Sequence, residues 1–272
     1  MVIKMITIDK ELIKDIVLKG NRIDGRKFDE YRKIKVETGV IEKAEGSARV
    51  ELGETKVVAG VKLELGEPFP DTPNQGVLIV SSEFVPIASP LFESGPPSEL
   101  SIELSRVVDR TIREAKAIDL EKLVVSENKV WMIFIDIIII DHDGNLIDAS
   151  ELASMIALLN AKIPNIIKGE KEIKIDTETK GTEPLPIVRR PVTITVAKIS
   201  NNLIIDPNFV EENAVDARLS VGSYEENGSI YLCSMQKGGT TGFSREEIEK
   251  AIDLVAEKQR GLREVIQSAI NN

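Results

Sequence analysis

The chain has 272 residues, of which 42% are hydrophobic and 29% are charged, the composition of an ordinary globular protein. Its formal charge of −10 argues against indiscriminate nucleic-acid binding by the whole surface, although a local basic patch remains compatible with it. The single cysteine, Cys233, excludes an internal disulfide and a typical thiolate zinc site. No apolar stretch reaches the roughly 18 residues that span a membrane, and the first twenty residues lack the pattern of a signal peptide. We therefore expect a cytoplasmic protein without membrane contact.

The N-terminal quarter predicts one helix followed by strands. Residues 9–19 have the amphipathic pattern of a short helix with Asp9 as its N-cap. A polar turn, "GNRIDGRKFDEYR" (20–32), comes next. Apolar and polar residues then alternate from 34 to 65, which predicts three strands joined by turns.

The middle of the chain predicts a strand, a long helix, a buried strand and a second helix. The strand "GVLIVSSEFV" (76–85) crosses a proline-rich connection, and a helix capped by Ser98 follows. A buried strand is predicted over 129–140 and a helix rich in small residues over 149–162. The apolar stripe of the long helix is predicted to consist of Leu100, Leu104, Val107, Val108, Ile112 and Ala115.

The second half repeats the order of strands followed by a long helix. After a charged connection come strand patterns between 191 and 239 and a helix over about 244–269. Two such units predict an α+β protein made of two similar β-α subdomains packed as one domain. The expected boundaries are an N-terminal helix and turn (1–30), a first subdomain (31–165), a connecting segment (166–190) and a C-terminal subdomain (191–272).

The segment "WMIFIDIIIIDHDGNLIDAS" (131–150) has four aspartates and the only histidine, yet it lacks the partners of a working centre. A phosphatase with Asp141 as nucleophile and Asp143 as acid/base also needs a lysine and a second carboxylate pair, which the chain does not offer. Adjacent residues point apart, so Asp141, His142 and Asp143 do not converge on a metal ion. We interpret "DG" as a turn, His142 as an exposed turn residue and Asp148 as a helix N-cap.

Several longer motifs resemble the RNase PH family. They are "RIDGR" (22–26), "EGSARVELGETKVVAGVK" (45–62), "GEPFPDTPNQG" (66–76), "SIELSRVVDRTIRE" (101–114) and "DGNLIDAS" (143–150). The stretch "RLSVGSYEENGSIYLCSMQKGG" (218–239) resembles the non-catalytic ring subunits of archaeal exosomes within that family. The resemblance implies the RNase PH fold and a six-membered ring around a pore for single-stranded RNA. It also implies an alternating catalytic paralogue and RNA-binding cap subunits as partners.

The chain departs from the active members of the family at two places. Active subunits have "DGGTR" where this chain reads "DGNLI" (143–147), so Asn145 replaces a glycine and Ile147 replaces the arginine that holds the attacking phosphate. Their acidic signature resembles "DPNFVEENAVDAR" (206–218), in which one aspartate has become Glu212 and the last has become Arg218, while Asp206 and Asp216 remain carboxylates. The departures imply a subunit with no catalytic residue, metal or cofactor of its own.

RNA binding is the function that this chain retains in our interpretation. Arg106, Arg110 and Arg113 follow one another at i, i+4 and i+7 on one helix face, where they suit successive phosphates. The alternative is a solvated face in which these arginines pair with neighbouring acids. Arg22 and Arg26 are further candidates, for RNA or for a subunit interface. Two alternative functions remain at this point, an exoribonuclease active by itself and an Asp141 phosphatase.

Overall fold

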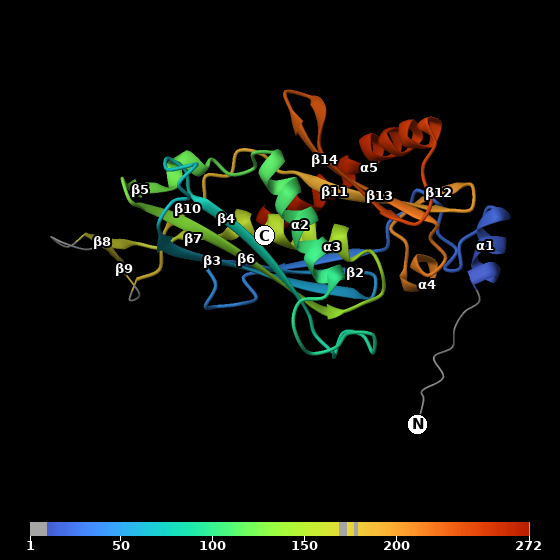
Figure 1. The fold of residues 1–272 in the computed structure, drawn as a ribbon, viewed down its shortest axis with the longest axis horizontal. Helices are drawn as coiled ribbons and strands as arrows, with labels where there is room; N and C mark the ends of the chain where they lie inside the picture. Colours follow the sequence, from blue (N-terminus) through green and yellow to red (C-terminus); the bar gives the residue numbers. More distant parts are fainter. Residues whose placement is uncertain (1–9, 169–172, 177–178, 272) are drawn as a thin grey trace.

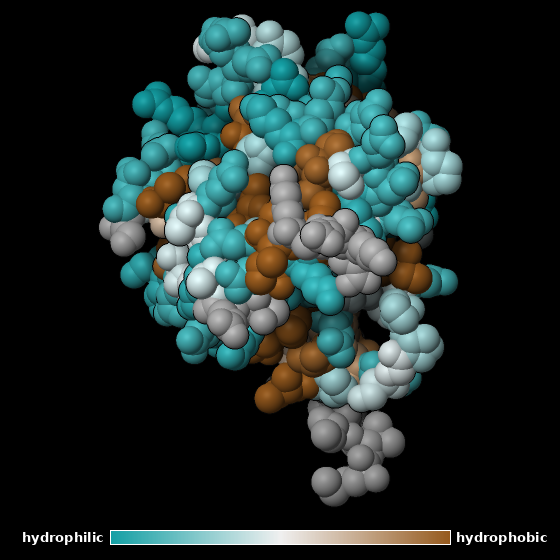
Figure 2. All heavy atoms as spheres, turned by 90° about the vertical axis from the view of Figure 1, so that its left-hand side faces the viewer, coloured by the Kyte–Doolittle hydropathy of each residue, from teal (hydrophilic) through white to brown (hydrophobic). Residues whose placement is uncertain are grey.

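The computed structural model describes residues 10–168, 173–176 and 179–271 (Figure 1). The predicted N-cap Asp9 lies outside these residues, and the helix it precedes, α1 (Lys10–Leu18), buries Ile13 and Val17. No helix in the described part of the chain is long and apolar enough to cross a membrane. Figure 2 shows the end of the molecule that carries β5 and β10, where hydrophilic side chains predominate and apolar ones appear between them.

The first unit is a mixed sheet with two helices. Its strands lie in the order β1-β2-β3-β6-β4, with β5 paired to β6, and every pairing except the parallel β4–β6 pair is antiparallel. The alternating pattern of residues 34–65 therefore gave three strands as predicted. The strands are β1 (Ile34–Thr38), β2 (Gly46–Leu52), β3 (Thr55–Gly66), β4 (Val77–Phe84), β5 (Val124–Ser126) and β6 (Lys129–Asp141).

The second unit is an antiparallel sheet of order β12-β11-β13-β14, covered by the long C-terminal helix α5 (Arg245–Asn271). A one-turn helix, α4 (Phe209–Glu212), connects β12 to β13. Short strands β7 to β10 fill the connection between the two units. The bounds are β11 (Val192–Ile199), β12 (Asn202–Ile205), β13 (Ala217–Glu226), β14 (Ser229–Gly239), β7 (Lys162–Ile163), β8 (Ile166–Lys168), β9 (Ile173–Ile175) and β10 (Glu183–Pro184).

Helix α3 (Leu146–Asn160) lies between the two sheets and explains why they form one body. It packs on β2 and β3 of the first sheet, on β11 of the second and on α5 (Figure 1). Because it is enclosed, nearly all of its residues are buried, and small side chains such as Ala153 allow close packing. One continuous hydrophobic core joins Ile135, Ile156, Ile194 and Val255. The α+β organisation with two packed β-α units agrees with the prediction.

Helix α2 (Glu99–Glu114) confirms the predicted cap and corrects the predicted stripe. The Ser98 Oγ accepts a hydrogen bond from the Ser101 amide at 3.2 Å. Leu100 is 59% exposed rather than buried, because it borders a surface cavity and does not pack in the hydrophobic core. Helix α2 ends at Glu114, and a separate 3₁₀ turn (Leu120–Leu123) follows it.

Candidate nucleic-acid interface

The loop between β6 and α3 brings the aspartate-rich segment to the junction of the two units. Gly144 has φ +84°, and a Cβ there would lie 2.5 Å from the backbone carbon of Asn208, so only glycine permits this close approach. The Phe209 amide donates to the carbonyl of Asp143 at 3.0 Å. Asn145 has a left-handed backbone (φ 54°) and precedes the first residue of α3. The loop therefore packs closely against the segment that carries α4 and is hydrogen-bonded to it.

Asp141 and Asp143 bind different cations and do not face one another as a catalytic pair. Lys56 lies 3.0 Å from the Asp141 carboxylate, and Arg32 lies 3.0 Å from that of Asp143. Burial raises the pKa of Asp143, with Arg32 acting in the opposite direction. Among the described residues, no group of three His, Cys, Asp or Glu side chains could hold a metal ion. Nothing in this arrangement supplies a phosphatase centre.

His142 is half-buried, so the expectation of an exposed turn residue was wrong. Its ring stacks on Phe92 with centroids 5.3 Å apart and meets the edge of Phe209 at 5.1 Å. Burial, together with the nearby charge of Arg32, lowers its pKa to about 4. The imidazole is therefore neutral at physiological pH, and its main role is to pack against Phe92 and Phe209.

The prediction that Asp148 caps a helix was also wrong, since α3 begins two residues earlier and encloses this carboxylate. Asp148 accepts hydrogen bonds from the Tyr31 hydroxyl at 2.7 Å, the Asn145 side-chain amide at 3.0 Å and the Thr195 backbone amide at 3.1 Å. Burial outweighs these bonds and raises its pKa to about 6. The residue joins the N-terminal segment, α3 and β11, which is a structural role.

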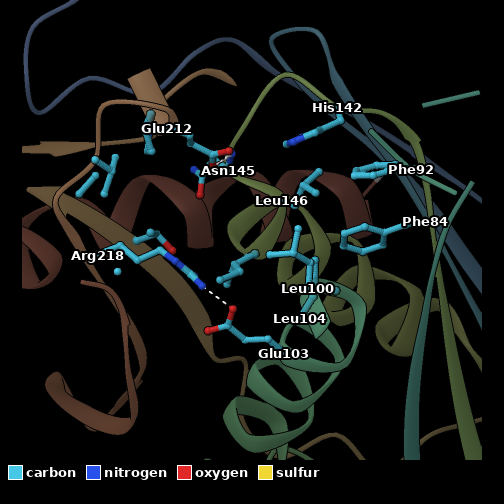
Figure 3. Close-up of a pocket in the computed structure, with 16 residues that line it drawn as sticks. Phe84, Phe92, Leu100, Glu103, Leu104, His142, Asn145, Leu146, Glu212 and Arg218 are labelled. Atoms are coloured by element: carbon cyan, nitrogen blue, oxygen red, sulfur yellow. Dashed lines mark hydrogen bonds and ion pairs between the residues drawn. The ribbon is translucent and has the colours of Figure 1, made fainter. Parts of the chain in front are cut away.

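A cavity of about 280 Å³ opens between α2, the start of α3, α4 and β13 (Figure 3). Ile147 lies on its wall, at the position where the active pattern requires an arginine. Arg218 also borders it, but its guanidinium pairs with Glu103 at 2.5 Å. Glu212 accepts a hydrogen bond from the Asn145 backbone amide at 2.7 Å. Burial raises the pKa of Glu212 to about 7. The backbone amide of Asn145, immediately before α3, is thus occupied by the protein's own carboxylate.

The two surviving carboxylates of the acidic signature are held by cations elsewhere. Asp206 is fully buried and accepts from Arg26 at 2.9 Å and from Arg32 at 2.7 Å. Asp216 pairs with Lys14 of α1 at 3.0 Å and accepts from the Ser200 amide at 2.7 Å. Neither lines the cavity. Both carboxylates therefore stabilise the fold rather than face a reacting group.

The three arginines of α2 are all exposed, but they differ in their partners. Arg113 pairs with Asp109 at 2.6 Å and donates to the Leu78 carbonyl at 3.0 Å, so the salt-bridged alternative holds for this residue. Arg106 and Arg110 have no ion-pair or hydrogen-bond partner in the described chain, and both border two neighbouring surface pockets. The sequence alone could not show that the neighbouring acidic residues of α2 form no ion pair with Arg106 or Arg110.

Arg22 and Arg26 bind within the molecule, contrary to the expectation that they serve RNA or a subunit interface. The Arg22 guanidinium is buried against the Glu211 carboxylate at 2.6 Å and donates to the Ile205 and Asp206 carbonyls. Arg26 pairs with Asp24 at 2.8 Å and with Asp206. These side chains fasten the N-terminal segment to the second unit. The long separation along the chain, 189 residues for Arg22 and Glu211, hid this contact from sequence reasoning.

Comparison with known proteins assigns the fold to a family. The model of domain 1 of the 3′ exoribonuclease family, RNase PH, matches residues 30–164, and the model of its domain 2 matches residues 190–258. The chain belongs to the RNase PH family. The expected RNase PH fold is confirmed, with each of the two units matched by one of the family's domains.

The similar proteins include archaeal exosome components. The Exosome complex component Rrp42 of Methanothermobacter thermautotrophicus is 49% identical over 264 residues, covering 97% of this chain and 96% of the relative. The Pyrococcus horikoshii Rrp42 is 47% identical over 262 residues, covering 96% and 94%. A chain of the Archaeoglobus fulgidus exosome with RNA bound to the active site is 43% identical, with a TM-score of 0.83 and coverage of 94% of this chain and 96% of that one.

Proposed function

We propose that this chain is a non-catalytic ring subunit of an archaeal exosome, a complex that degrades RNA from the 3′ end with phosphate as attacking group. It alternates with a catalytic paralogue in a hexameric cytoplasmic ring, meets RNA-binding cap subunits, and binds single-stranded RNA. Membership of the RNase PH family and the likeness to Rrp42 components over nearly the whole chain support this proposal.

The observation that carries the non-catalytic part is the occupation of the anion position at the start of α3. A helix N-terminus attracts a phosphate through free amides and a nearby cation. Here the Asn145 amide donates to Glu212, Ile147 offers no charge, and the charge of Arg218 is balanced by Glu103. An attacking phosphate would compete with the Glu212 carboxylate for the Asn145 backbone amide. No unpaired cation among the described residues of the cavity wall would bind that phosphate.

The RNA-binding part rests on Arg106 and Arg110. Residues four apart on a helix have Cβ atoms roughly 6 Å apart on the same face, so the two guanidinium groups can contact neighbouring phosphates. Both are exposed and lack an acidic partner among the described residues, so binding RNA breaks no ion pair. Contacts to phosphates carry no base information, which suits a complex that degrades RNA of any sequence. Arg113 contributes less in this proposal, since it is already held by Asp109.

The test is RNA binding by the ring assembled from this chain and its catalytic paralogue. Fluorescence anisotropy with a single-stranded RNA is measured at several salt concentrations for the unchanged ring and for Arg106→Ala/Arg110→Ala. The proposal expects weaker binding and a salt dependence that flattens by about 1.4 in slope for two lost phosphate contacts. The matched control is Arg245→Ala/Arg260→Ala on α5, which removes two exposed arginines elsewhere. Equal affinities and slopes for all three rings would contradict the proposal.

A further inference from the structure

Arg189, Tyr224 and Tyr231 form a row of stacked side chains at the end of the hairpin that joins β13 and β14. Tyr224 and Tyr231 are partners in the antiparallel register, and their side chains stack with centroids 5.2 Å apart and planes inclined by 14°. The Arg189 guanidinium lies over the Tyr224 side chain, 4.8 Å from its centroid. Arg189 also pairs with Glu226 at 2.9 Å and donates to the carbonyl of Ala115, the residue directly after α2, at 3.1 Å. The row is therefore fixed at the C-terminal end of α2.

The outer side of Tyr231 is open because β14 is an edge strand. The order of the sheet is β12-β11-β13-β14, so no strand of the described chain pairs with β14 on its outer side. Strand β11 pairs with β13 only as far as Ser223, and the end of the hairpin projects beyond it (Figure 1). Tyr231 is 44% exposed, and within the described residues it stacks on Tyr224 alone. An exposed aromatic group at the end of a stack offers a place for one further flat group.

Tyr231 lies near the two unpaired arginines of α2. Arg106 and Arg110 border a surface pocket together with Ser234 of β14. The Ser234 hydroxyl lies 2.8 Å from that of Thr111, so this part of β14 is in contact with the helix. Tyr231 precedes Ser234 by three residues, which corresponds to roughly 10 Å along a strand. One short single-stranded segment can therefore contact Arg110 and Tyr231 together.

The acids around this surface leave its cations free. Glu114, one helical turn after Arg110, borders the pocket on the β4 side of the helix and not the pocket beside β14. Beside β14, Glu103 is engaged by Arg218 at 2.5 Å, and Glu99 stands in the first turn of α2, at the end away from the tyrosines. Sites that bind single-stranded RNA without sequence preference combine free cations with aromatic side chains on which bases stack. The stacked tyrosines and the two free arginines provide this combination.

We propose that Tyr231 stacks on one base of the RNA whose phosphates lie on Arg106 and Arg110. Tyr224 and Arg189 hold the phenol group of Tyr231 in place from the inner side of the hairpin. Every base has a flat face, so the contact needs no particular sequence, which suits a complex that degrades RNA of any sequence. The inference rests on the proposed function and adds a contact with the RNA bases to it.

RNA binding by the assembled ring tests this contact, with oligo(A) and oligo(U) as the single strands. Tyr231→Ala removes the phenol group and should weaken the binding of both by about tenfold, which corresponds to roughly 1.4 kcal/mol for one stacked base. Tyr231→Phe keeps an aromatic group and should bind like the unchanged protein. The matched control is Ile230→Ala, since Ile230 is 41% exposed and adjacent in the strand but points to the opposite face of the hairpin.

A tryptophan at the same position reports stacking directly. Tyr231→Trp should retain RNA binding, and its fluorescence should be quenched when oligo(U) is added, because a base then lies against the indole. Ile230→Trp is the control and should not respond to oligo(U). Trp131, the one natural tryptophan of this chain, is 5% exposed and gives both variants the same background.

The outcomes separate this inference from the proposed function. If Tyr231→Ala binds both oligonucleotides like Ile230→Ala while Arg106→Ala/Arg110→Ala weakens them, the stacking contact is refuted and RNA binding by the arginines stands. If neither set of variants changes binding, both fall. If Tyr231→Ala instead prevents assembly of the ring, measured by analytical ultracentrifugation, Tyr231 contacts a neighbouring subunit and the contact with RNA is refuted.

Discussion

Arg218 of β13 and Glu103 of α2 lie 2.5 Å apart on the wall of the cavity and join the two β-α units there (Figure 3). Glu103 also borders the surface pocket in which Arg106 and Arg110 stand free, so the pair neutralises both the Arg218 guanidinium and an acid of that pocket. Because both side chains are partly exposed, the pair adds at most about 1 kcal/mol to stability. Its larger effect is on the local charge that an RNA chain meets.

Release of Arg218 should therefore strengthen RNA binding. In Glu103→Gln the guanidinium becomes available to a phosphate, and we expect about a two- to threefold gain in affinity and a salt slope steeper by about 0.7. The control is Glu99→Gln, which removes an acid from the same groove without freeing an arginine. Equal slopes for the two variants, measured by anisotropy over a salt series, would rule out a phosphate contact by Arg218.

The three arginines of α2 should contribute unequally. Arg113 is held by Asp109 and the Leu78 carbonyl, so its transfer to RNA costs an existing ion pair. We expect Arg113→Ala to weaken RNA binding less than half as much, in free energy, as Arg110→Ala. Thermal unfolding of both variants checks that the fold survives. A loss for Arg113→Ala as large as for Arg110→Ala would show that the ion pair opens on binding.

Glu212 predicts a pH dependence of stability. Burial raises its folded pKa to about 7 from an ordinary value of 4.5. A raised carboxyl pKa means that the folded protein binds the proton more tightly, so the contribution of Glu212 to stability is highest below about pH 4.5 and falls between about 4.5 and 7. The loss is on the order of 3 kcal/mol once the group is fully ionised. Glu212→Gln keeps an acceptor for the Asn145 amide and should remove this decline.

Urea unfolding at pH 5 and pH 8 measures the effect. The free energy of unfolding should fall more between these values in the unchanged protein than in Glu212→Gln. The control is Glu246→Gln, an exposed position on α5. Parallel pH profiles for the unchanged protein and Glu212→Gln would mean that Glu212 ionises as freely in the fold as in the unfolded chain.

The buried pair of Arg22 and Glu211 should be one of the strongest single contacts. Both side chains are fully buried, so Arg22→Met leaves the buried Glu211 carboxylate with only Arg26, at 4.0 Å, as a cationic partner and should cost about 3 to 5 kcal/mol. Arg22→Met/Glu211→Leu removes both charges and should recover much of that loss. The exposed Arg260–Glu264 pair serves as control, with Arg260→Met costing less than about 1 kcal/mol. An equal cost for the single and double variants at the buried pair would contradict the account.

The sequence predicted the elements well because their patterns are local. Alternation gave β1 to β3, and Ser98 marked the start of α2 because its hydroxyl binds an amide three residues away. One error is the start of α3, predicted at 149 and found at Leu146, and the errors at Leu100 and His142 concern the tertiary fold. Asp148 looked like a cap, but its partners Tyr31 and Thr195 are distant in the chain.

The candidate site shows the same division. The replacement at Ile147 could be identified by resemblance, and the structure places that side chain in the cavity. The engagement of Arg218 with Glu103, 115 residues away, and of Glu212 with the Asn145 amide could not be read from spacing. Which arginines of α2 remain free was equally hidden, because a helix face offers several acids and only the three-dimensional packing selects among them.

The central claim, a subunit that lacks catalysis of its own, is tested most directly by release of nucleoside diphosphates from unstructured RNA in the presence of inorganic phosphate. The purified chain, its catalytic paralogue and their mixture are compared at equal subunit concentration. The account predicts no release by this chain alone and release that appears or rises in the mixture. Release by this chain alone would show that Ile147 and the engaged Arg218 do not prevent phosphorolysis.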